Sequence, residues 1–385
     1  MQFSNDQNRA LYLYKAGHNL VITGPGGTGK SKWIQYVATD PGVQVCAMTG
    51  CAAILLECNA KTVHSWAGIG IDDASKAIRN EHVKLRWKNT RVLIIDEISM
   101  MSDTLFDLLN KVGQTIRSSC LPFGGIQLVF CGDFYQLPPV RSNFCFESPQ
   151  WDVAFKHTIE FTTVFRQKNT VYQEILHEVR KGHLSESNRL LIEERITQGE
   201  GVKLVPTRAK ADHINTIEYT KLTTEEKEYS MKFSSSNEYE KDYLRKNSRC
   251  DESIKLKVGT KVMCIVNLDV VCNGSQGIVV SIDEYPIVKF SHGNVCIRPH
   301  VWSYGSTIMT QLPLIYAWGI TIHKAQGATL ETACIDLGND VFEYGQTYVA
   351  LSRVVDLSGL YLTSFNPHKI RVHPKVEKYY TSIKE

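Results

Sequence analysis

A glycine-rich segment near the N-terminus, NLVITGPGGTGKS at residues 19–31, constrains the fold more than any other feature of the sequence. Its first part, residues 20–22, has the apolar character of a buried strand, and the run after residue 31 has helical character. The eight-residue spacing of a phosphate-binding loop is satisfied by Gly24, Gly29, Lys30 and Ser31. Such a loop requires a strand before it and a helix after it, so the segment predicts an α/β domain.

The chemistry of this loop suits a polyphosphate. Glycines allow backbone N–H groups to turn inward, and the N-terminus of the following helix adds a positive potential. Lys30 would reach the terminal phosphates, and Ser31 offers a hydroxyl to Mg²⁺. The alternative is an incidental glycine-rich turn. The residues expected to hold the nucleotide are Gly24, Gly26, Gly27, Thr28, Gly29, Lys30 and Ser31.

A second apolar run ends in two adjacent carboxylates. Residues 91–95 suit a buried parallel strand, and Asp96 and Glu97 follow directly. Acidic residues at the C-terminal end of such a strand lie in the ligand crevice of an open α/β sheet. We expect Asp96 to hold Mg²⁺ through water and Glu97 to orient and deprotonate the attacking water. The alternative is a strand that ends in surface charges.

Composition narrows the class of protein. The chain has 385 residues, of which 43% are hydrophobic and 22% are charged, as in ordinary soluble proteins. This length predicts roughly two to four cores. No apolar run is long enough to span a bilayer, and residues 1–10 lack a targeting signature. We therefore expect a soluble, intracellular protein without a membrane partner, in the nucleus, the cytoplasm or a viral replication site.

The cysteines and the net charge exclude several kinds of site. The eleven cysteines include no CxxC pair and no grouping with histidines at ligand spacing. Scattered thiols are typical of a reducing compartment and argue against disulfides, zinc sites and iron–sulfur clusters. The formal net charge of +3 is mild. A nucleic-acid partner would therefore bind in a local groove and not over the whole surface.

Polar groups that suit a single strand of nucleic acid follow the next predicted strand, residues 43–48. They supply hydroxyls, backbone amides, an imidazole and an indole, which can contact backbone phosphates and stack on bases. A lone tryptophan or histidine is more often part of the core, and that alternative stays open. The residues in this group are Thr49, Gly50, Thr62, His64, Ser65 and Trp66.

Three further polar residues lie where they could contact the nucleotide. Gln136 follows a third apolar strand and could sense the γ-phosphate; the alternative is a turn made rigid by the prolines that follow. Arg166 lies just beyond the first predicted nucleotide domain and could cross a cleft to a transferring phosphate, although a surface arginine is commoner. Gln7 could recognise the adenine edge through its amide, or it could close a capping box with Ser4.

The middle of the chain changes character twice. Residues 169–194 look helical, and residues 202–222 read as strand, turn and helix, which starts a second α/β region. Residues 223–250 are rich in Glu, Lys and Ser and are expected to be an exposed linker or partly disordered. Five short β segments between residues 254 and 299 then predict a small closed β-barrel. Turn signals within it are Asn273-Gly274 and His292-Gly293.

The α/β pattern returns after the predicted barrel. His323 and Lys324 are expected to open a helix beside Gly327, a combination that could clamp phosphates of nucleic acid or nucleotide. Arg353 lies near the end of a helix expected to start around Gly345, so it could project into an interdomain cleft. Taken singly, each of these residues is as readily structural as functional.

Nine blocks of the sequence form an ordered series. They are GPGGTGKS, TGCAA, TVHSWAGIG, IIDEISMM, PFGGIQLVFCGDFYQLPPV, VFRQ, LKVGTKVM with NGSQGIVV, TIHKAQGAT and YVALSRV. In order and in spacing, this series resembles the motifs of the PIF (petite integration frequency) helicase family, in the B branch of helicase superfamily one and related to RecD. The similarity covers nearly all of residues 7–363 and is weak in residues 220–250 and in the polar insertion near Asp72.

The resemblance implies an α/β fold with two tandem RecA-like phosphate-loop domains. A small wedge would be inserted in the first domain and an SH3-like β-barrel in the second. The implied boundaries are 1–168 for the first domain with its wedge at about 67–88, 169–222 and 303–385 for the second, and 223–302 for the polar linker and barrel, the barrel itself at about 254–300.

The resemblance also implies roles for particular residues. Gln7 would read adenine and Gln136 would sense the γ-phosphate, while Arg166 and Arg353 would be paired arginine fingers. Ala325 stands where the family usually has serine, which removes a hydroxyl from the DNA side. The other implied roles are phosphate and Mg²⁺ binding by Lys30 and Ser31, metal binding and base catalysis by Asp96 and Glu97, and DNA contact by Thr62, His64, Thr321, His323 and Lys324.

The activity that the resemblance implies is ATP-driven, 5′-to-3′ movement on single-stranded DNA with unwinding of duplex or forked DNA. The implied setting is DNA replication, repair or recombination, with a monomer acting on the DNA. Because the long terminal extensions of eukaryotic members do not occur here, we expect a bare motor. The alternative is a nucleotide-switched protein that binds single-stranded DNA without unwinding. A phosphotransferase acting on a small molecule is a third class that would share the loop.

Overall fold

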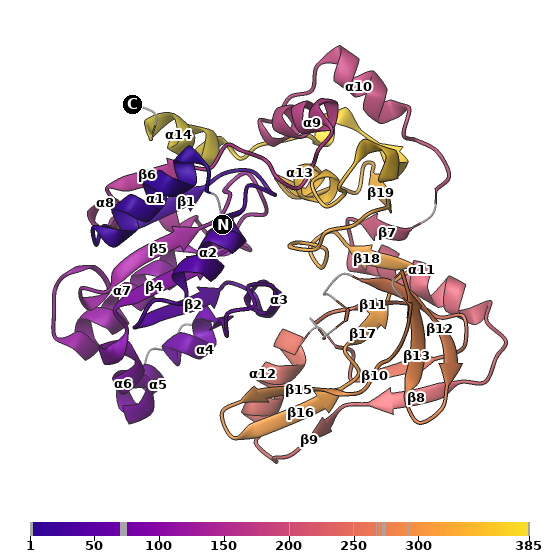
Figure 1. Cartoon of the computed structure of the whole chain (residues 1–385), viewed down its shortest axis with the longest axis horizontal. Helices are drawn as coiled ribbons and strands as arrows, with labels where there is room; N and C mark the ends of the chain where they lie inside the picture. The colour runs from indigo at the N-terminus through magenta and orange to yellow at the C-terminus, as the bar shows by residue number, and fades with distance from the viewer. Residues whose placement is uncertain are drawn as a thin grey trace. The chain divides into compact units, whose positions relative to one another are not determined.

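The computed structural model describes residues 3–69, 75–199, 201–248, 250–266, 268, 270–271, 275–291 and 293–383. The predicted turn at Asn273-Gly274, and His292 of the second predicted turn, lie outside these residues. The chain divides into two compact units, coloured by residue number in Figure 1. Unit 1 comprises Met1–Leu184, Glu343–Tyr348 and Ile370–Glu385, and unit 2 comprises Ser185–Phe342 and Val349–Lys369.

Unit 1 is built on a six-stranded parallel sheet with the strand order β3-β2-β4-β5-β1-β6. The strands are β1 (Leu20–Thr23), β2 (Val43–Ala47), β3 (Lys61–Thr62), β4 (Val92–Asp96), β5 (Gln127–Cys131) and β6 (His157–Glu160). Both β1 and β4 are buried along their whole length. Strands covered on both faces read as continuous apolar runs, which is why these two could be identified in the sequence.

Two hydrophobic cores lie on opposite faces of this sheet. Alternate residues of β4 enter different cores: Leu93 and Ile95 pack with α7, and Val92 and Ile94 pack with α1 and α2. The helices of unit 1 are α1 (Asn5–Lys15), α2 (Lys30–Val37), α3 (Gly50–Leu55), α4 (Val63–Ala67), α5 (Ser75–Arg79), α6 (Glu81–Asn89), α7 (Asp103–Arg117), α8 (Trp151–Ala154), α9 (Thr170–Arg180) and α14 (Pro374–Ser382). Helices α5 and α6 lie within the predicted wedge insertion.

Unit 2 contains a second parallel sheet, with the strand order β18-β7-β19-β20. Its strands are β7 (Val202–Val205), β18 (Gly319–Thr321), β19 (Ala333–Leu337) and β20 (Leu360–Phe365), and its helices include α10 (Glu186–Glu193) and α11 (Arg208–Thr220). The side chain of Asn215 ties α11 to β18 by exchanging two 2.8 Å hydrogen bonds with the backbone of Gly319. The prediction of two α/β regions, each with a parallel sheet, is confirmed.

An antiparallel region interrupts unit 2. Its largest sheet has five strands in the order β14-β13-β12-β11-β17, and two smaller sheets have the orders β10-β8 and β15-β16-β9. The elements are β8 (Lys227–Ser230), β9 (Lys232–Phe233), α12 (Glu238–Ser248), β10 (Ser253–Leu256), β11 (Lys261–Cys264), β12 (Gln276–Ile282), β13 (Pro286–Phe290), β14 (Gly293–Cys296), β15 (His300–Tyr304), β16 (Thr307–Gln311) and β17 (Leu314–Tyr316). The first predicted barrel segment, β10, pairs with β8 and not with the five-stranded sheet.

Most described residues of 223–250 are exposed, as predicted, but the prediction of a linker or of partial disorder is wrong. This stretch forms β8, β9 and α12, and both strands pair with strands from later in the chain. Helix α12 is held by a few good contacts: Leu244 is buried, and the ring of Tyr243 stacks on Tyr304 with centroids 3.7 Å apart. The low apolar content of this stretch predicted disorder. The contacts that order α12 come from residues 300–310, which the composition of the stretch itself does not include.

The predicted domain boundaries also differ from the structure. Residues 169–222 and 303–385 were assigned to one second domain, but α9 and α14 belong to unit 1. Arg180, the last residue of α9, is buried against Asp133 with a nitrogen–oxygen distance of 3.0 Å, and Tyr380 of α14 is buried in the core of unit 1. A buried charge requires its partner, so α9 is fixed to the unit that holds Asp133.

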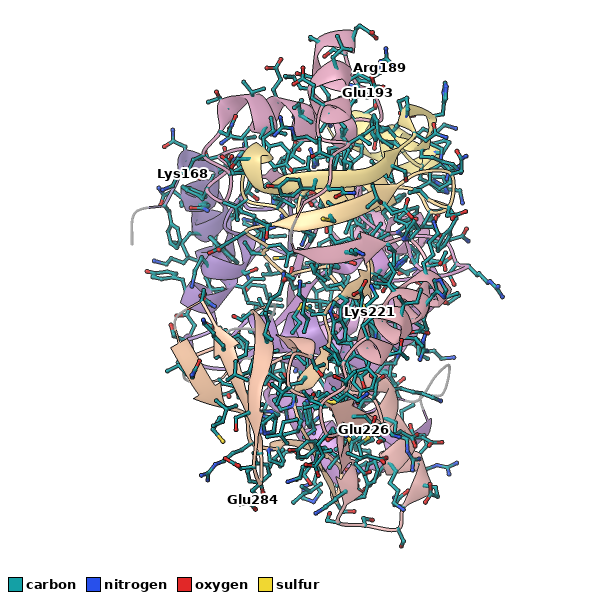
Figure 2. All side chains as sticks on the ribbon, turned by 90° about the vertical axis from the view of Figure 1, so that its right-hand side faces the viewer. Lys168, Arg189, Glu193, Lys221, Glu226 and Glu284 are labelled. Carbon is teal, nitrogen blue, oxygen red and sulfur yellow. The ribbon has the colours of Figure 1, made fainter. Side chains whose placement is uncertain are left out.

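Charged side chains gather on the outer surfaces of the helices. On α10, Arg189 lies 2.9 Å from Glu193 and 2.5 Å from Glu186, and Figure 2 labels the first two of these residues. Exposed pairs of this kind contribute at most about 1 kcal/mol to stability, so the fold depends on its cores. Among the described residues, no helix has the length and apolar character needed to cross a bilayer.

Candidate functional site

The predicted phosphate loop lies between β1 and α2 and is shaped by two glycines that no other residue could replace. Gly24 has a φ of +136°, and a Cβ there would lie 2.2 Å from the carbonyl oxygen of Phe161. Gly27 has a φ of +85°, and a Cβ there would lie 2.5 Å from the Cβ of Arg166. The loop therefore packs directly against residues 161–166, and its backbone needs the left-handed region that favours glycine.

Lys30 begins α2 and points back into the loop. Its Nζ donates to the carbonyl oxygens of Gly24, at 2.6 Å, and Pro25, at 2.9 Å. Burial lowers the pKa of Lys30, while the nearby carboxylates of Asp133 and Asp96 act in the opposite direction. The structure thus places the ammonium group inside the loop, as the sequence predicted for a group that meets terminal phosphates.

Both interpretations of Gln7 have a basis in the structure. Its backbone N–H donates to Ser4 Oγ at 3.3 Å, and its Oε1 accepts from the Ser4 N–H at 3.0 Å, which completes the capping box of α1. Its Nε2 also donates to the carbonyl oxygen of Thr28 at 3.1 Å. The cap is therefore confirmed, and the amide also lies against the phosphate loop. Recognition of adenine by Gln7 stays a prediction.

The two carboxylates at the end of β4 have different environments. Asp96 is 7% exposed, and its Oδ1 accepts from the backbone N–H of Glu97 at 2.9 Å. Burial, followed by the charge of Glu97, raises the pKa of Asp96 from its usual 3.8 to about 7. Glu97 adopts a left-handed backbone with a φ of +58°, a conformation that costs energy in a residue with a side chain. Strain and buried charge together are typical of a functional site.

Gln136 lies beyond β5 and is 6% exposed. Its Oε1 is buried and has no hydrogen-bond partner among the described residues. Such a group costs free energy unless a ligand or water satisfies it, so an unpaired buried acceptor indicates a place where a donor binds. This environment is compatible with the predicted role of Gln136 at the γ-phosphate, where the amide oxygen would accept from a water.

The two predicted arginine fingers belong to different units. In unit 1, the backbone N–H of Phe165 donates to the Gly27 carbonyl oxygen at 2.8 Å, which places the neighbouring Arg166 beside the phosphate loop. In unit 2, Arg353 is 2% exposed, and its Nε donates to the Val349 carbonyl oxygen at 2.9 Å. Arg353 thus lies against the helix that precedes it, α13 (Gln346–Leu351), and its role as a finger stays a prediction.

A buried polar network beneath the loop was missed in the sequence. Arg180 is 1% exposed, and it pairs with both oxygens of Asp133 and with Glu160 at 3.0 Å. The ring of Tyr380 stacks on Tyr135 with centroids 4.5 Å apart. Its hydroxyl shares a hydrogen bond with Thr23, the residue just before the loop. These partners are 20 to 357 residues apart in the chain, so no local spacing could have revealed them.

Two of the predicted DNA-contacting residues after β2 and β3 also act as helix caps. Thr49 Oγ1 accepts from the N–H of Ala52 at 3.2 Å, and Thr62 Oγ1 accepts from the N–H of Ser65 at 3.3 Å. His64 and Ser65 are partly exposed on α4, and Gly50 is the first residue of α3. Hydroxyl groups that accept from a backbone N–H still have a proton to donate to a phosphate.

Trp66 was predicted to stack on bases, and the structure corrects this prediction. It is 1% exposed, and its ring lies 4.5 Å from that of Trp87, so it belongs to the core of unit 1 and offers no open face to a base. The sequence had left this alternative open. An indole in the core contributes a large buried apolar area, which explains a tryptophan at this position without any ligand.

The second group of predicted DNA-contacting residues surrounds the end of β18 in unit 2. The backbone N–H of Lys324 donates to Thr321 Oγ1 at 3.2 Å, and the ring of His323 stacks on Phe342 with centroids 6.1 Å apart. The predicted helix does not form: residues 322–327 are a series of turns, and Gly327 has a φ of +83°. A left-handed glycine ends helical geometry, which accounts for the difference.

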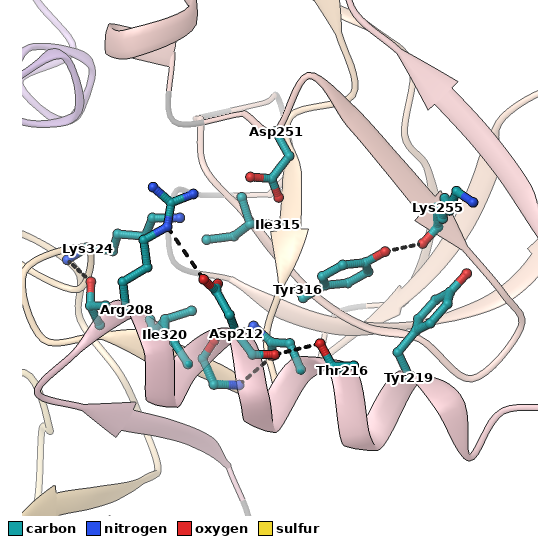
Figure 3. Close-up of a pocket in the computed structure, with 14 residues that line it drawn as sticks. Arg208, Asp212, Thr216, Tyr219, Asp251, Lys255, Ile315, Tyr316, Ile320 and Lys324 are labelled. Carbon is teal, nitrogen blue, oxygen red and sulfur yellow. Dashed lines mark hydrogen bonds and ion pairs between the residues drawn. The ribbon is translucent and has the colours of Figure 1, made fainter.

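Lys324 and Thr321 line a cavity of about 380 Å³ between α11 and the strands β17 and β18. Figure 3 shows Lys324 beside Arg208, with Tyr316 and Lys255 on the other wall. The phenol of Tyr316 donates to the Lys255 carbonyl oxygen at 2.6 Å. Basic and aromatic side chains around one hollow suit a single strand of nucleic acid, although Asp212, paired with Arg208 at 3.6 Å, and Asp251 also line it.

Comparison with known proteins supplies a family for this arrangement. The profile described as PIF1-like helicase matches residues 3–189, and that of the DNA helicase Pif1 2B domain matches residues 241–282. The chain is 33% identical over 461 residues to the ATP-dependent DNA helicase PIF1 of Emericella nidulans, covering 96% of this chain and 62% of that protein. It therefore spans about three fifths of that relative's length.

Other relatives match over almost their whole length. The ATP-dependent DNA helicase Pif1 of Bdellovibrio bacteriovorus is 32% identical over 407 residues, which cover 99% of this chain and 92% of that protein. The crystal structure of Pif1 helicase from Bacteroides in complex with ADP-AlF3 and ssDNA superposes with a TM-score of 0.77 at 26% identity, covering 100% of this chain and 98% of that one. This chain belongs to the PIF1-like helicase family.

Proposed function

We propose that this protein is an ATP-dependent DNA helicase that moves 5′-to-3′ on single-stranded DNA and separates duplex DNA. The observation that carries the proposal is the buried arrangement of the phosphate loop, Lys30 and Asp96 in a chain that belongs to the PIF1-like helicase family. Relatives named as ATP-dependent DNA helicases match this chain over 96% and 99% of its length. The direction of movement rests on the family resemblance alone.

In this proposal, unit 1 binds and activates the nucleotide. Backbone amides of the loop and the ammonium of Lys30 bind the phosphates, and the amide of Gln7 recognises adenine. Glu97 takes the proton of the attacking water, and Gln136 orients that water through its unpaired Oε1. Two carboxylates with different surroundings fit a division of roles between metal binding and base catalysis.

Mg²⁺ fits the donors in this site. Asp96 is a buried carboxylate whose pKa is raised by burial and by the charge of Glu97, so a cation beside it would compensate a buried negative charge. We propose that Ser31 and Asp96 hold the ion, because hydroxyl and carboxylate oxygens suit a hard cation. When bound, Mg²⁺ would neutralise charge on the phosphates. Lys30 then has the phosphates as partners in place of its own loop carbonyls.

Arg166 and Arg353 are proposed to serve turnover and not binding. A guanidinium that reaches the transferring phosphoryl group stabilises charge that develops in the transition state, which contributes about 10³ to 10⁵ in rate. Removal of that charge by hydrolysis then weakens the attraction between the phosphate and the arginines. This cycle provides a means by which ATP hydrolysis drives movement on DNA.

Single-stranded DNA is the proposed track, and duplex or forked DNA is the substrate. Candidate contacts are Thr49, Gly50, Thr62, His64 and Ser65 in unit 1, and Thr321, His323 and Lys324 in unit 2. The related Bacteroides protein was crystallised with ssDNA, which supports this partner. Phosphate contacts and stacking carry little sequence information, so we expect binding without sequence specificity, by a monomer on the DNA.

A strand-separation assay tests the proposal. A duplex with a 5′ single-stranded tail should be unwound with ATP and Mg²⁺, while a matched duplex with a 3′ tail and a blunt duplex should not. The Lys30→Ala variant should be inactive on all three. Binding of ATP and single-stranded DNA without strand separation would favour the alternative of a nucleotide-switched binding protein. ATP hydrolysis that does not respond to DNA would favour a phosphotransferase.

A further inference from the structure

Tyr348 makes a direct hydrogen bond to the phosphate loop, although no motif assigned it a role. Its hydroxyl accepts from the backbone N–H of Gly26 at 3.0 Å, and the side chain is only 3% exposed. Both residues belong to unit 1. Gly26 lies in the part of the loop whose amides are expected to turn toward phosphate oxygens, and an amide has one hydrogen to donate. The tyrosine hydroxyl and a phosphate oxygen are therefore competing acceptors for one donor.

The segment that carries Tyr348 also packs on the turn that carries Gln136. Gly345 has a φ of +69°, and a Cβ there would lie 2.4 Å from the carbonyl oxygen of Tyr135 and 2.7 Å from that of Gln136. The N–H of Gly345 donates to the Arg371 carbonyl oxygen at 3.2 Å, which anchors the segment from the other side. Residues Glu343–Tyr348 thus contact both the phosphate loop and the turn of the predicted γ-phosphate sensor.

The surroundings of Tyr348 are rigid and charged. Burial acts to lower the pKa of Arg180, but the charge of Asp133 and the nearby hydroxyls of Tyr380 and Tyr348 raise it well above its usual value. Tyr348 therefore lies close to the buried Arg180–Asp133 pair beneath the loop. A side chain surrounded by such groups has few alternative rotamers. A displacement of Gly26 would therefore move the backbone of Tyr348, because the ring of Tyr348 has little room to change its rotamer.

The backbone of Tyr348 continues directly to the predicted arginine finger. Tyr348 lies within α13, which begins in unit 1 and ends in unit 2. Arg353 follows two residues after α13, and its Nε donates to the carbonyl oxygen of Val349, the residue next to Tyr348. A displacement of Tyr348 is therefore transmitted through covalent bonds and one 2.9 Å hydrogen bond to the guanidinium.

We propose that Tyr348 is a positioning residue that exchanges its hydrogen bond to Gly26 for nucleotide binding and so couples the loop to Arg353. When the Gly26 N–H donates to a phosphate oxygen, the tyrosine hydroxyl loses that donor, and one restraint on the position of α13 is removed. Because the hydroxyl competes with the phosphate for the Gly26 N–H, nucleotide binding is weaker than it would be without the hydroxyl. The same competition makes the position of Arg353, in the other unit, depend on whether the loop holds a nucleotide. This inference rests on the proposed ATPase function.

The Tyr348→Phe variant tests the proposal because it keeps the buried ring and removes the hydroxyl that accepts from Gly26. Loss of a competing hydrogen bond should tighten binding of a fluorescent ADP analogue by about two- to tenfold, and the KM for ATP should fall accordingly. The kcat measured with single-stranded DNA should fall roughly fivefold or more, because the loop and Arg353 are no longer coupled. A residue that only supported the fold would not give tighter binding together with slower turnover.

Tyr344→Phe is the matched control, because Tyr344 lies in the same segment and its ring contacts His373 and Arg371 away from Gly26. It should leave both the nucleotide affinity and kcat unchanged. Unchanged or weaker nucleotide binding in Tyr348→Phe, with an unchanged melting temperature, would overturn the proposal. The nucleotide affinity is measured without DNA, so this readout stays valid even if the wild-type protein showed no DNA-stimulated hydrolysis and the helicase proposal failed.

Discussion

Lys30 in unit 1, which is partly buried, and Arg353 in unit 2, which is fully buried, are both expected to serve the same phosphate, but they are positioned in different ways. Lys30 is bonded to the loop that precedes it, and it lies within the fields of Asp133 and Asp96, which come from two other strand ends. Arg353 is bonded to Val349 and Ser352, its near neighbours in the chain, and at 3.5 Å to the carbonyl oxygen of Ala328. Both cations must give up hydrogen bonds to meet a phosphate, but carboxylates from other strand ends act on Lys30, whereas Arg353 is held mainly by residues close to it in the chain.

This difference suggests that binding and turnover are divided between the two cations. Substitution of Lys30 should affect both, because binding of the phosphates depends on its ammonium group. Substitution of Arg353 should affect turnover alone. The following predictions test this division, starting with the largest expected effect.

Lys30→Ala should abolish ATP hydrolysis and weaken nucleotide binding, because no other described side chain bonds to the loop carbonyls of both Gly24 and Pro25. The measurements are steady-state phosphate release and titration with a fluorescent nucleotide. Lys32→Ala is the control, since Lys32 is an exposed residue of the same helix that bonds to Gln35. Full hydrolysis in Lys30→Ala would refute its assignment.

Arg353→Ala should retain nucleotide affinity and lose roughly 10³-fold in DNA-stimulated kcat, the magnitude typical of an arginine finger. Pre-steady-state phosphate release and nucleotide titration separate the two quantities. Arg189→Ala, which alters only a surface ion pair on α10, should behave as the wild type. If Arg353→Ala bound nucleotide as poorly as Lys30→Ala, the proposed division between the two cations would be wrong.

Arg180→Met should destabilise unit 1 by roughly 3–5 kcal/mol, because it leaves Asp133 charged and buried without its partner. Urea denaturation followed by tryptophan fluorescence measures the loss. Arg189→Met provides the surface comparison and should cost at most about 1 kcal/mol. Equal losses of unfolding free energy in the two variants would show that the buried Arg180–Asp133 pair does not stabilise unit 1.

Asp96→Asn should make the folded protein more stable at pH 8 while abolishing hydrolysis. The pKa of Asp96 is about 7 in the folded state against a usual 3.8, so the folded protein binds this proton more tightly than the unfolded chain. The contribution of Asp96 to stability is therefore greatest below about pH 4 and falls as the pH rises toward 7. The variant should gain up to about 4 kcal/mol at pH 8 and nothing below about pH 4.

Denaturation curves across this pH range measure the effect. A pH-independent difference between Asp96→Asn and the wild type would contradict the raised pKa. It would also remove the electrostatic reason for placing a cation beside Asp96.

Gln7→Glu has the smallest expected effect and separates the two roles of Gln7. Glutamate keeps the capping box with Ser4 but cannot donate as the amide nitrogen does, and its carboxylate would be buried against the Thr28 carbonyl oxygen, so some loss of stability is expected as well. If the amide reads adenine, the KM for ATP should rise about two- to tenfold while the KM for a pyrimidine triphosphate stays the same. Equal rises for both nucleotides would instead indicate a general disturbance of the loop through Thr28.

Prediction from the sequence succeeded where the functional residues directly follow, in the chain, the strand that positions them. The phosphate loop and Asp96 each follow an apolar strand directly, so their positions could be predicted before the fold was known. It failed where a contact joins distant segments. Arg180 looks like any last residue of a helix until Asp133, 47 residues away, is known to lie beside it. Likewise, the polar residues 227–248 become ordered only through strands and rings from later in the chain.

Two errors arose because one residue type serves two purposes. Trp66 has the side chain for base stacking, but its neighbour in space is Trp87, and the pair fills a core. The helix expected to open at His323 is replaced by turns, and Gly327 at their end has a left-handed backbone. In both cases the sequence pattern was identified correctly. Its structural outcome depended on packing with other parts of the chain.

The hydrogen bond between Thr23 and Tyr380 has a consequence for biosynthesis. The strand that leads into the phosphate loop, β1, is synthesised before the helix that contacts it, α14, because Tyr380 follows Thr23 by 357 residues. At about 5 to 20 residues per second, the two are made roughly 20 to 70 seconds apart. The strand before the loop therefore lacks this contact until α14 has been synthesised, and unit 1 can be completed only after that point.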